Sequence, residues 1–117
     1  MSMILHIAYR AQWERGQAEG AYQAESLATQ GFIHTSRPDQ LLGVANAIFK
    51  GQTDLVLLYV DPGKVSAEIK YEVPSGSHEA FPHIYGLLST SAVIKVVDFL
   101  PDDNGLFALP ADLASPE

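Results

Sequence analysis

The chain has 117 residues, of which 47% are hydrophobic and 18% are charged, so it is long enough and apolar enough for one packed domain, and this composition argues against wholesale disorder. Its 7 basic and 14 acidic residues give a net charge of −7, which opposes bulk attraction to nucleic acid or to anionic lipid. The sequence contains no cysteine, which excludes disulfides, thiolate metal sites and cysteine nucleophiles.

The beginning of the chain predicts a strand followed by a short helix. Residues 3–8 are apolar except for His6, which we expect to be a hydrogen-bonded core or edge residue. Residues 11–19 predict a helix that packs through Trp13, and residues 22–30 predict a loop with one turn of helix. This start lacks the pattern of a signal peptide, and no later run is long enough for a membrane helix, so we expect a cytoplasmic protein without a membrane partner.

The segment Gly31-Phe32-Ile33-His34-Thr35-Ser36 is a short apolar strand that ends in three polar side chains. Residues 38–49 carry apolar side chains at spacings of three and four, which predicts an amphipathic helix. Ser36 lies just before this helix and is a residue type typical of an N-cap. A helix N-terminus exposes N–H groups that favour an anionic ligand. We interpret His34, Thr35 and Ser36 as ligand-binding residues; the alternative is a polar strand exit followed by a simple cap.

The second half of the chain is mostly strand. Residues 54–60 predict a strand covered on both faces, residues 65–73 a half-exposed strand, and residues 92–100 a last strand, to which residues 106–109 could add a hairpin partner. Early helices followed by antiparallel strands indicate an α+β class. We expect a single domain over residues 1–110 and a loose tail over residues 111–117.

The segment Phe81-Pro82-His83-Ile84-Tyr85-Gly86 predicts a stiff loop, because proline and glycine restrict its ends. In this interpretation His83 and Tyr85 point the same way, and the segment's two large apolar residues, Phe81 and Ile84, pack inward. If the loop lies beside His34, it forms a polar pocket for which Glu72 is the nearest carboxylate. The alternative is an aromatic-lined core in which His83 caps a carbonyl group.

Three kinds of chemistry could use these side chains. No HxH or HExxH spacing is present, so we expect no metal, and no G-x-S-x-G motif supports a serine hydrolase. A nucleotide site fits best: Tyr85 offers a stacking face, and His34 and His83 can hydrogen-bond ribose or phosphate.

Several segments together are similar to a known bacterial family, catalogued as domain of unknown function 952. The resemblance runs from about Ile4 to Phe99 and rests on Trp13, residues 31–36, residues 55–62, Tyr71-Glu72 and residues 81–86. The family has no established activity to carry over. The sequence departs from it at Leu87, where the family is expected to have proline.

This resemblance implies the ADP-ribosyltransferase-like fold, in which small mixed or antiparallel sheets, with two or three early helices, clasp NAD. It implies that His34-Thr35-Ser36 contacts the adenosine ribose and that Tyr85 or Tyr59 stacks on nicotinamide. Glu72 would take the part of the glutamate that stabilises positive charge on the ribose. However, Glu72 precedes His83, which differs from the usual order and leaves a related reaction, or binding without catalysis, open.

Our leading hypothesis is an NAD- or nucleotide-binding enzyme with NAD as substrate. Its catalytic residues would be Glu72 and His83, and its ligand would be held by His34, Thr35, Ser36 and Tyr85. The alternative is a non-catalytic domain that binds a small metabolite or a peptide. No nucleic acid partner is expected, and no protein partner is indicated.

Overall fold

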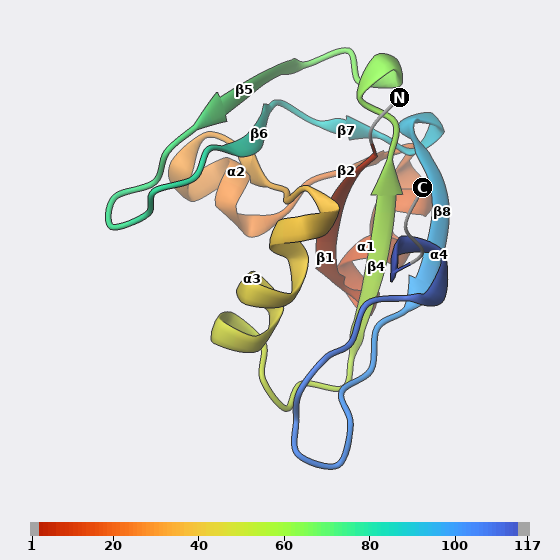
Figure 1. The fold of residues 1–117 in the computed structure, drawn as a ribbon. Helices are drawn as coiled ribbons and strands as arrows, with labels where there is room; N and C mark the ends of the chain where they lie inside the picture. Colours follow the sequence, from red (N-terminus) through yellow and green to blue (C-terminus); the bar gives the residue numbers. More distant parts are fainter. Residues whose placement is uncertain (1–2, 115–117) are drawn as a thin grey trace.

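The computed structural model describes residues 3–114, which form a mixed α+β domain with antiparallel sheets (Figure 1). Its central sheet has the order β1-β4-β8, with β1 at Ile4–Tyr9, β4 at Leu55–Val60 and β8 at Val93–Asp98. Every residue of β4 is buried, as predicted from its uninterrupted apolar run. Side chains alternate across a strand, so β4 supplies two separate hydrophobic cores.

A second three-stranded sheet covers one face of the central sheet. Its order is β3-β6-β5, with β3 at Ile33–His34, β6 at Phe81–Tyr85 and β5 at Glu68–Glu72. Ile33 and Ile84 are fully buried and belong to the same core as Leu58 of β4. The opposite face of this second sheet carries polar and aromatic side chains, because residues of opposite parity point away from the core.

The early helices and a two-stranded sheet close the same core. Helix α1 spans Arg10–Glu19, α2 spans Glu25–Gln30, and β2 at Ala21–Tyr22 pairs with β7 at Leu88–Ser89. Trp13 and Tyr22 are both buried, so the expected packing role of Trp13 is confirmed. Helix α2 ends at Gly31, whose φ of 89° is in the left-handed region that glycine adopts readily.

The other core lies between the central sheet and α3. A 3-10 helix, η1 at Pro38–Gln40, leads into α3 at Leu41–Ile48, and Phe99 stacks on Phe107 with 4.6 Å between ring centroids. Two further 3-10 helices, η2 at Pro62–Lys64 and η3 at Thr90–Ala92, turn the chain at strand ends. Helix α4 at Ala111–Ala114 is the last element described.

Ser36 is not the helix N-cap that the sequence predicted. Its backbone N–H donates to the carbonyl of Leu5, and its carbonyl accepts from the N–H of Leu5, both at 2.8 Å. These bonds continue the chain as an extended segment beside β1, so the cap falls on Arg37 and Pro38 is the first residue of η1.

The segment predicted as a stiff loop is strand β6, the central strand of its sheet. Proline normally argues against such a position because it has no N–H to donate. Here the Pro82 carbonyl accepts from Thr35 twice, from its N–H at 3.2 Å and from its hydroxyl at 2.5 Å, so the sheet is held without that donor. Strand geometry also places Phe81 on the same face as His83 and Tyr85, whereas we had expected it to pack inward.

Residues 106–109 do not form the hairpin partner that the sequence suggested. Phe107 donates its N–H to the Asn46 side chain at 2.7 Å and packs instead into the core between the central sheet and α3, which we call the second core. Part of the expected tail is α4, where Asp112 accepts from the Tyr59 hydroxyl and from Lys95, each at 2.8 Å. Residues 115–117 lie outside the described residues, and within residues 3–114 no helix is long and apolar enough to cross a membrane.

Candidate functional site

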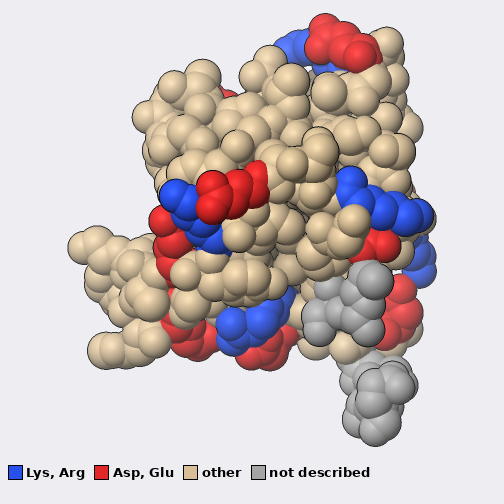
Figure 2. Space-filling model, turned by 90° about the horizontal axis from the view of Figure 1, so that it is seen from above, with Lys and Arg blue, Asp and Glu red and all other residues tan. Residues whose placement is uncertain are grey.

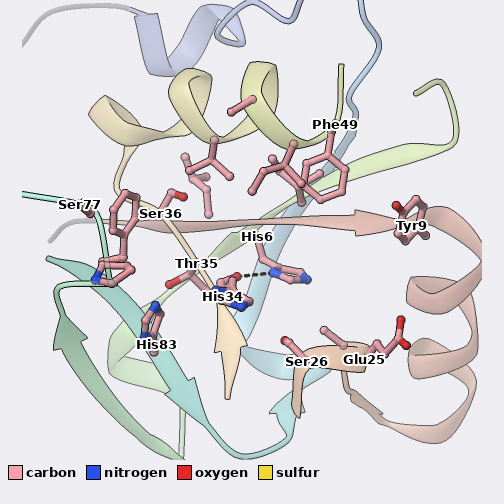
Figure 3. A pocket seen from close by; sticks show the side chains of 18 of the residues that line it. His6, Tyr9, Glu25, Ser26, His34, Thr35, Ser36, Phe49, Ser77 and His83 are labelled. Atoms are coloured by element: carbon pink, nitrogen blue, oxygen red, sulfur yellow. Dashed lines mark hydrogen bonds between the residues drawn. The ribbon is translucent and has the colours of Figure 1, made fainter. Parts of the chain in front are cut away.

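A cleft of about 800 Å³ opens between β1, α2, α3 and the loop that joins β5 to β6 (Figure 3). Its Phe and Tyr lining comes from Tyr9, Tyr22, Phe49 and Phe81, and residues 74–77 of the β5–β6 loop form one wall. Cavities that bind small molecules usually have volumes of roughly 300–1,000 Å³ and mainly apolar walls with a few polar groups. The cleft therefore has the size of a ligand site.

Four of the six predicted site residues line this cleft: His34, Thr35, Ser36 and His83. The pairing of β3 with β6 places His34 opposite His83, with 5.4 Å between their ring centroids. Thr35 and Ser36 are buried, whereas the His34 side chain is exposed. The register of β3 with β6 thus brings residues 31–36 and residues 81–86 side by side, as the pocket hypothesis required.

Glu72 and Tyr85, the other two predicted residues, do not line the cleft but lie behind His83. Oε1 of Glu72 is 2.8 Å from Nδ1 of His83 and accepts from the Tyr85 hydroxyl at 2.6 Å. These two hydrogen bonds, with that of Tyr85 the stronger influence, lower the pKa of the Glu72 carboxyl. An ionised carboxylate can only accept, so Nδ1 of His83 carries the hydrogen and Nε2 is left for another partner.

Phe32 does not line the cleft, but it packs against two residues that do, a supporting role that our sequence interpretation missed. Its ring stacks on the His83 imidazole, with 4.1 Å between centroids and 15° between planes, and it meets His34 edge-on at 4.8 Å. The stacking holds the plane of the His83 ring, and the hydrogen bond to Glu72 determines which edge of the ring carries Nδ1. The available signal was strand alternation, which puts Phe32 and His34 on one face.

His6 combines the structural role we expected with a place in the cleft wall. Its Nδ1 donates to the His34 carbonyl at 2.5 Å, as drawn in Figure 3, and its Nε2 accepts from the Tyr22 hydroxyl at 2.8 Å. Burial lowers the pKa of His6 to about 4. His6 is therefore a neutral imidazole with a defined tautomer at neutral pH, and it supports the backbone of His34.

His34 itself is held by a neighbouring side chain. Its Nε2 lies 2.8 Å from Oε1 of Gln30, at the end of α2. Desolvation, and to a smaller extent the nearby His83, lower the pKa of His34. The cleft thus presents a neutral His34 at its mouth at pH 7.

Tyr59, the alternative stacking residue, is remote from the cleft. It packs in the core between the central sheet and α3, and its hydroxyl donates to Asp112 at 2.8 Å. Tyr59 is buried, so it has no face to offer a ligand. This part of the prediction is wrong because both faces of β4 are covered.

The charges around the cleft are sparse. Among the described residues that line it, Glu25 is the one Asp, Glu, Lys or Arg side chain. Seen from above in Figure 2, basic side chains form separate spots, several of them beside acidic ones. Within residues 3–114 no group of three or more His, Asp or Glu side chains is arranged to hold a metal ion.

These features define a small α+β protein with a ligand-sized, histidine-containing cleft between a sheet, two helices and a hairpin loop. The family described as "Protein of unknown function (DUF952)" matches residues 7–96, and the chain belongs to this family.

Solved structures of one relative, the protein CC0527 from Caulobacter crescentus, have the same fold. Two crystal structures, one of them of a double mutant, are each 33% identical, cover 97% of this chain and 100% of their own, and have a TM-score of 0.87. The solution NMR structure is 34% identical, covers 97% of this chain and 98% of its own, and has a TM-score of 0.84. No protein with curated annotation matches the chain.

Proposed function

We propose that the cleft binds NAD or a related nucleotide and that the protein is an enzyme related to the ADP-ribosyltransferases. The observation that carries this proposal is the placement of His34, opposite His83, beside the hydroxyl residues Thr35 and Ser36 in one cleft. Imidazole and hydroxyl groups suit the hydroxyl-rich ribose of a nucleotide, and the aromatic lining suits a base. The cleft volume of about 800 Å³ is sufficient for most of such a ligand.

His83 is the proposed catalytic residue, and Glu72 is its positioning residue. Because Nδ1 of His83 donates to Glu72, Nε2 is the atom that can accept a proton from an attacking hydroxyl group. In the proposed transfer the glycosidic bond between ribose and nicotinamide breaks, and nicotinamide leaves with the electron pair. A bond forms between the ribose carbon and the acceptor oxygen, whose proton passes to Nε2. Glu72 then stabilises the imidazolium through the shared hydrogen bond.

This arrangement changes the role we assigned to Glu72. Its carboxylate is turned towards His83 and Tyr85, so it would act on the ribose through His83 and not by direct contact. Tyr85 shares that carboxylate and lies under Lys70, whose Nζ is 4.8 Å from the ring centroid. Tyr85 is accordingly proposed to hold Glu72 and not to stack on the ligand.

The test is a calorimetric titration of the purified protein with NAD and with ADP-ribose, followed by chromatography for released nicotinamide. We expect binding that is lost in His34→Ala, and nicotinamide release that is lost in His83→Ala while binding remains. His78→Ala is the matched control, because His78 is exposed in the β5–β6 loop and does not line the cleft. Absence of binding by both nucleotides would rule the proposal out.

A non-catalytic site for a neutral metabolite is the second candidate. It is favoured by the lining of the cleft, to which no described Lys or Arg contributes and which therefore offers a diphosphate no ion pair. This candidate predicts that a ligand raises the melting temperature without any turnover, and that His83→Ala alters affinity alone. Release of nicotinamide by the wild-type protein would exclude it.

A further inference from the structure

One corner of the cleft contains a hydroxyl group without a partner. Oγ of Ser26, in the first turn of α2, is buried and has no hydrogen bond within the described residues 3–114. Ser26 lines the cleft together with His6, Tyr22 and Ala24, and we call these four residues the α2 corner. Figure 3 shows Ser26 on α2, below His6. Buried polar groups nearly always have a partner, so this hydroxyl points to a missing one.

The second hydroxyl of the α2 corner, that of Tyr22, has a hydrogen whose direction is defined. His6 Nδ1 must donate to the His34 carbonyl, which can only accept, so Nε2 of His6 is unprotonated. Tyr22 therefore donates its hydrogen to Nε2, and its oxygen retains only lone pairs for a ligand. The α2 corner thus offers an acceptor at Tyr22 and a rotatable hydroxyl, donor or acceptor, at Ser26.

No described residue of the corner carries a positive charge at pH 7. His6 is neutral because its burial lowers its pKa to about 4, and Glu25, on the same helix as Ser26, is an exposed acidic side chain of the cleft wall. An anionic group placed here would lose hydration, face the lone pairs of Tyr22 and be repelled by Glu25. A neutral group that both donates and accepts would satisfy Tyr22 and Ser26 together.

We infer that the α2 corner is a subsite for an uncharged hydrogen-bonding group of the ligand, such as a carboxamide or the amino edge of a heterocycle, and that it rejects the corresponding carboxylate. Such a group donates its N–H to the Tyr22 oxygen and accepts from the Ser26 hydroxyl. The inference rests on the proposed function in taking the cleft as the ligand site. It adds which chemical group of the ligand occupies this corner and which side chains select it.

The experiment uses benzamide and benzoate, which match in shape and differ in charge. Each is titrated into the full-length protein at pH 7, and binding is followed by amide chemical shifts in ¹H–¹⁵N NMR spectra. We expect benzamide to shift the resonances of residues 22–26 and to bind at least fivefold more tightly than benzoate. Ser26→Ala should weaken benzamide about fivefold, the effect of one net hydrogen bond, and leave benzoate unchanged.

Thr29→Ala is the matched control. Thr29 lies on the same helix, is exposed, does not line the cleft, and donates only to the backbone of Glu25. Its substitution should leave both affinities as in the wild type. Ala24 is the N-cap of α2, and no side chain in the described part of the chain caps that helix, so Ser26→Ala removes no capping bond.

Equal affinity for the two probes, shifts confined to other residues, an unchanged benzamide affinity in Ser26→Ala, or no binding of either probe up to its solubility limit would each overturn the inference. These outcomes are separate from failure of the proposed function. If benzamide binds selectively but NAD does not bind, the subsite is supported and the nucleotide proposal is refuted. If NAD binds but benzamide shows no selectivity, the nucleotide proposal is supported and the subsite is refuted.

Discussion

Nδ1 of His83 and Oε1 of Glu72 lie 2.8 Å apart, across neighbouring strands, with the imidazole buried and the carboxylate side chain 38% exposed. Solvent thus reaches the carboxylate but hardly the imidazole. The same oxygen accepts from the Tyr85 hydroxyl at 2.6 Å. A buried imidazole that is held by an outer carboxylate and an aromatic stack is a rigid group, which is what positioned proton transfer requires.

Glu72→Gln should reverse the tautomer of His83. The amide group of glutamine can donate to Nδ1, which would move the hydrogen to Nε2 and remove the acceptor that the proposed function requires. We expect a loss of roughly 10- to 100-fold in any binding or turnover that uses Nε2, the range for a charge-assisted hydrogen bond. The ¹⁵N shifts of the His83 ring report the tautomer directly.

Glu68→Gln serves as the control for that change, since Glu68 is exposed on the same strand and makes no side-chain hydrogen bond within residues 3–114. In the Glu68→Gln variant, the ¹⁵N shifts of the His83 ring should equal those of the wild type. An unchanged tautomer in Glu72→Gln would show that the carboxylate does not orient His83.

The stability of the protein should fall between pH 7 and pH 4 because of His6. Its pKa is 6.5 in the unfolded chain and about 4 in the folded one, so the unfolded state takes up the proton first. The stabilisation is complete above pH 6.5 and is lost as the pH falls through 4; at 1.36 kcal/mol per pKa unit it amounts to about 3 kcal/mol. Urea denaturation at several pH values measures it.

His6→Gln should be less stable at pH 7, because His6 is buried with two hydrogen bonds, but its stability should vary less between pH 7 and pH 4. His34 and Glu72, whose pKa values are also lowered, contribute further variation with the same sign. His78→Ala should retain the wild-type profile, since His78 is exposed. A profile for His6→Gln as steep as that of the wild type would refute this explanation.

Two glycines in helices should respond to alanine in opposite directions. A Cβ at Gly16 in α1 would lie 2.9 Å from Cα of Tyr22, whereas a Cβ at Gly43 in α3 would have no atom of residues 3–114 within 4 Å apart from its chain neighbours and its own helix backbone. Alanine favours a helix over glycine by about 1 kcal/mol, so Gly43→Ala should stabilise by about that amount. Gly16→Ala should destabilise by about 1–3 kcal/mol, because backbone atoms must move.

The free energy of unfolding of each variant, measured at pH 7 in urea, provides the test. Stabilisation by Gly16→Ala would mean that β2 moves away from α1 at little cost. Since Tyr22 also bonds to His6, such a movement would be visible in the His6 ring resonances.

Gln40 should control the order of the β5–β6 loop. Its side-chain amide is buried and donates to the Ala80 carbonyl at 2.9 Å and to Glu79 at 3.0 Å, which ties the base of the loop to η1. Gln40→Ala removes both bonds, so amide hydrogen exchange in residues 74–80 should become faster, by about five- to tenfold. Because residues 74–77 line the cleft, ligand affinity should fall as well.

Asn46→Ala provides a comparison for that variant. Asn46 also lies near a loop and accepts from the Phe107 N–H at 2.7 Å, but on the side of α3 that supports the second core. It should change exchange near residue 107 and leave residues 74–80 unaffected. Equal exchange of the loop in Gln40→Ala and in the wild type would contradict the assigned role.

Local pattern was sufficient for much of the fold. The uninterrupted apolar run of β4, the three-and-four spacing of α3 and the helix around Trp13 each reflect burial of a continuous segment, which a sequence records directly. The polar residues at the end of β3 were also recognisable as site candidates, and His34, Thr35 and Ser36 do line the cleft.

Other features depend on partners that are distant in the sequence. Proline disfavours a central strand, but β6 forms because Thr35 donates two hydrogen bonds to the Pro82 carbonyl. Ser36 has the residue type of a helix cap, but its backbone pairs with that of Leu5. Glu72 was expected in the pocket, yet its position behind His83 follows from the pairing of β5 with β6. A shift of one residue in the pairing of β5 with β6 would have placed the Glu72 side chain on the opposite face of the sheet.

The sequence by itself therefore determined the α+β class, its longer apolar strands and helices, and which polar residues are available to a site, because hydrophobic periodicity and turn residues act locally. Only the tertiary structure decided that His34 faces His83, that Glu72 orients this imidazole from outside the cleft, and that the Ser26 hydroxyl has no hydrogen-bond partner among residues 3–114. Those relations are set by strand register and by packing between segments far apart in the chain, which no local pattern specifies.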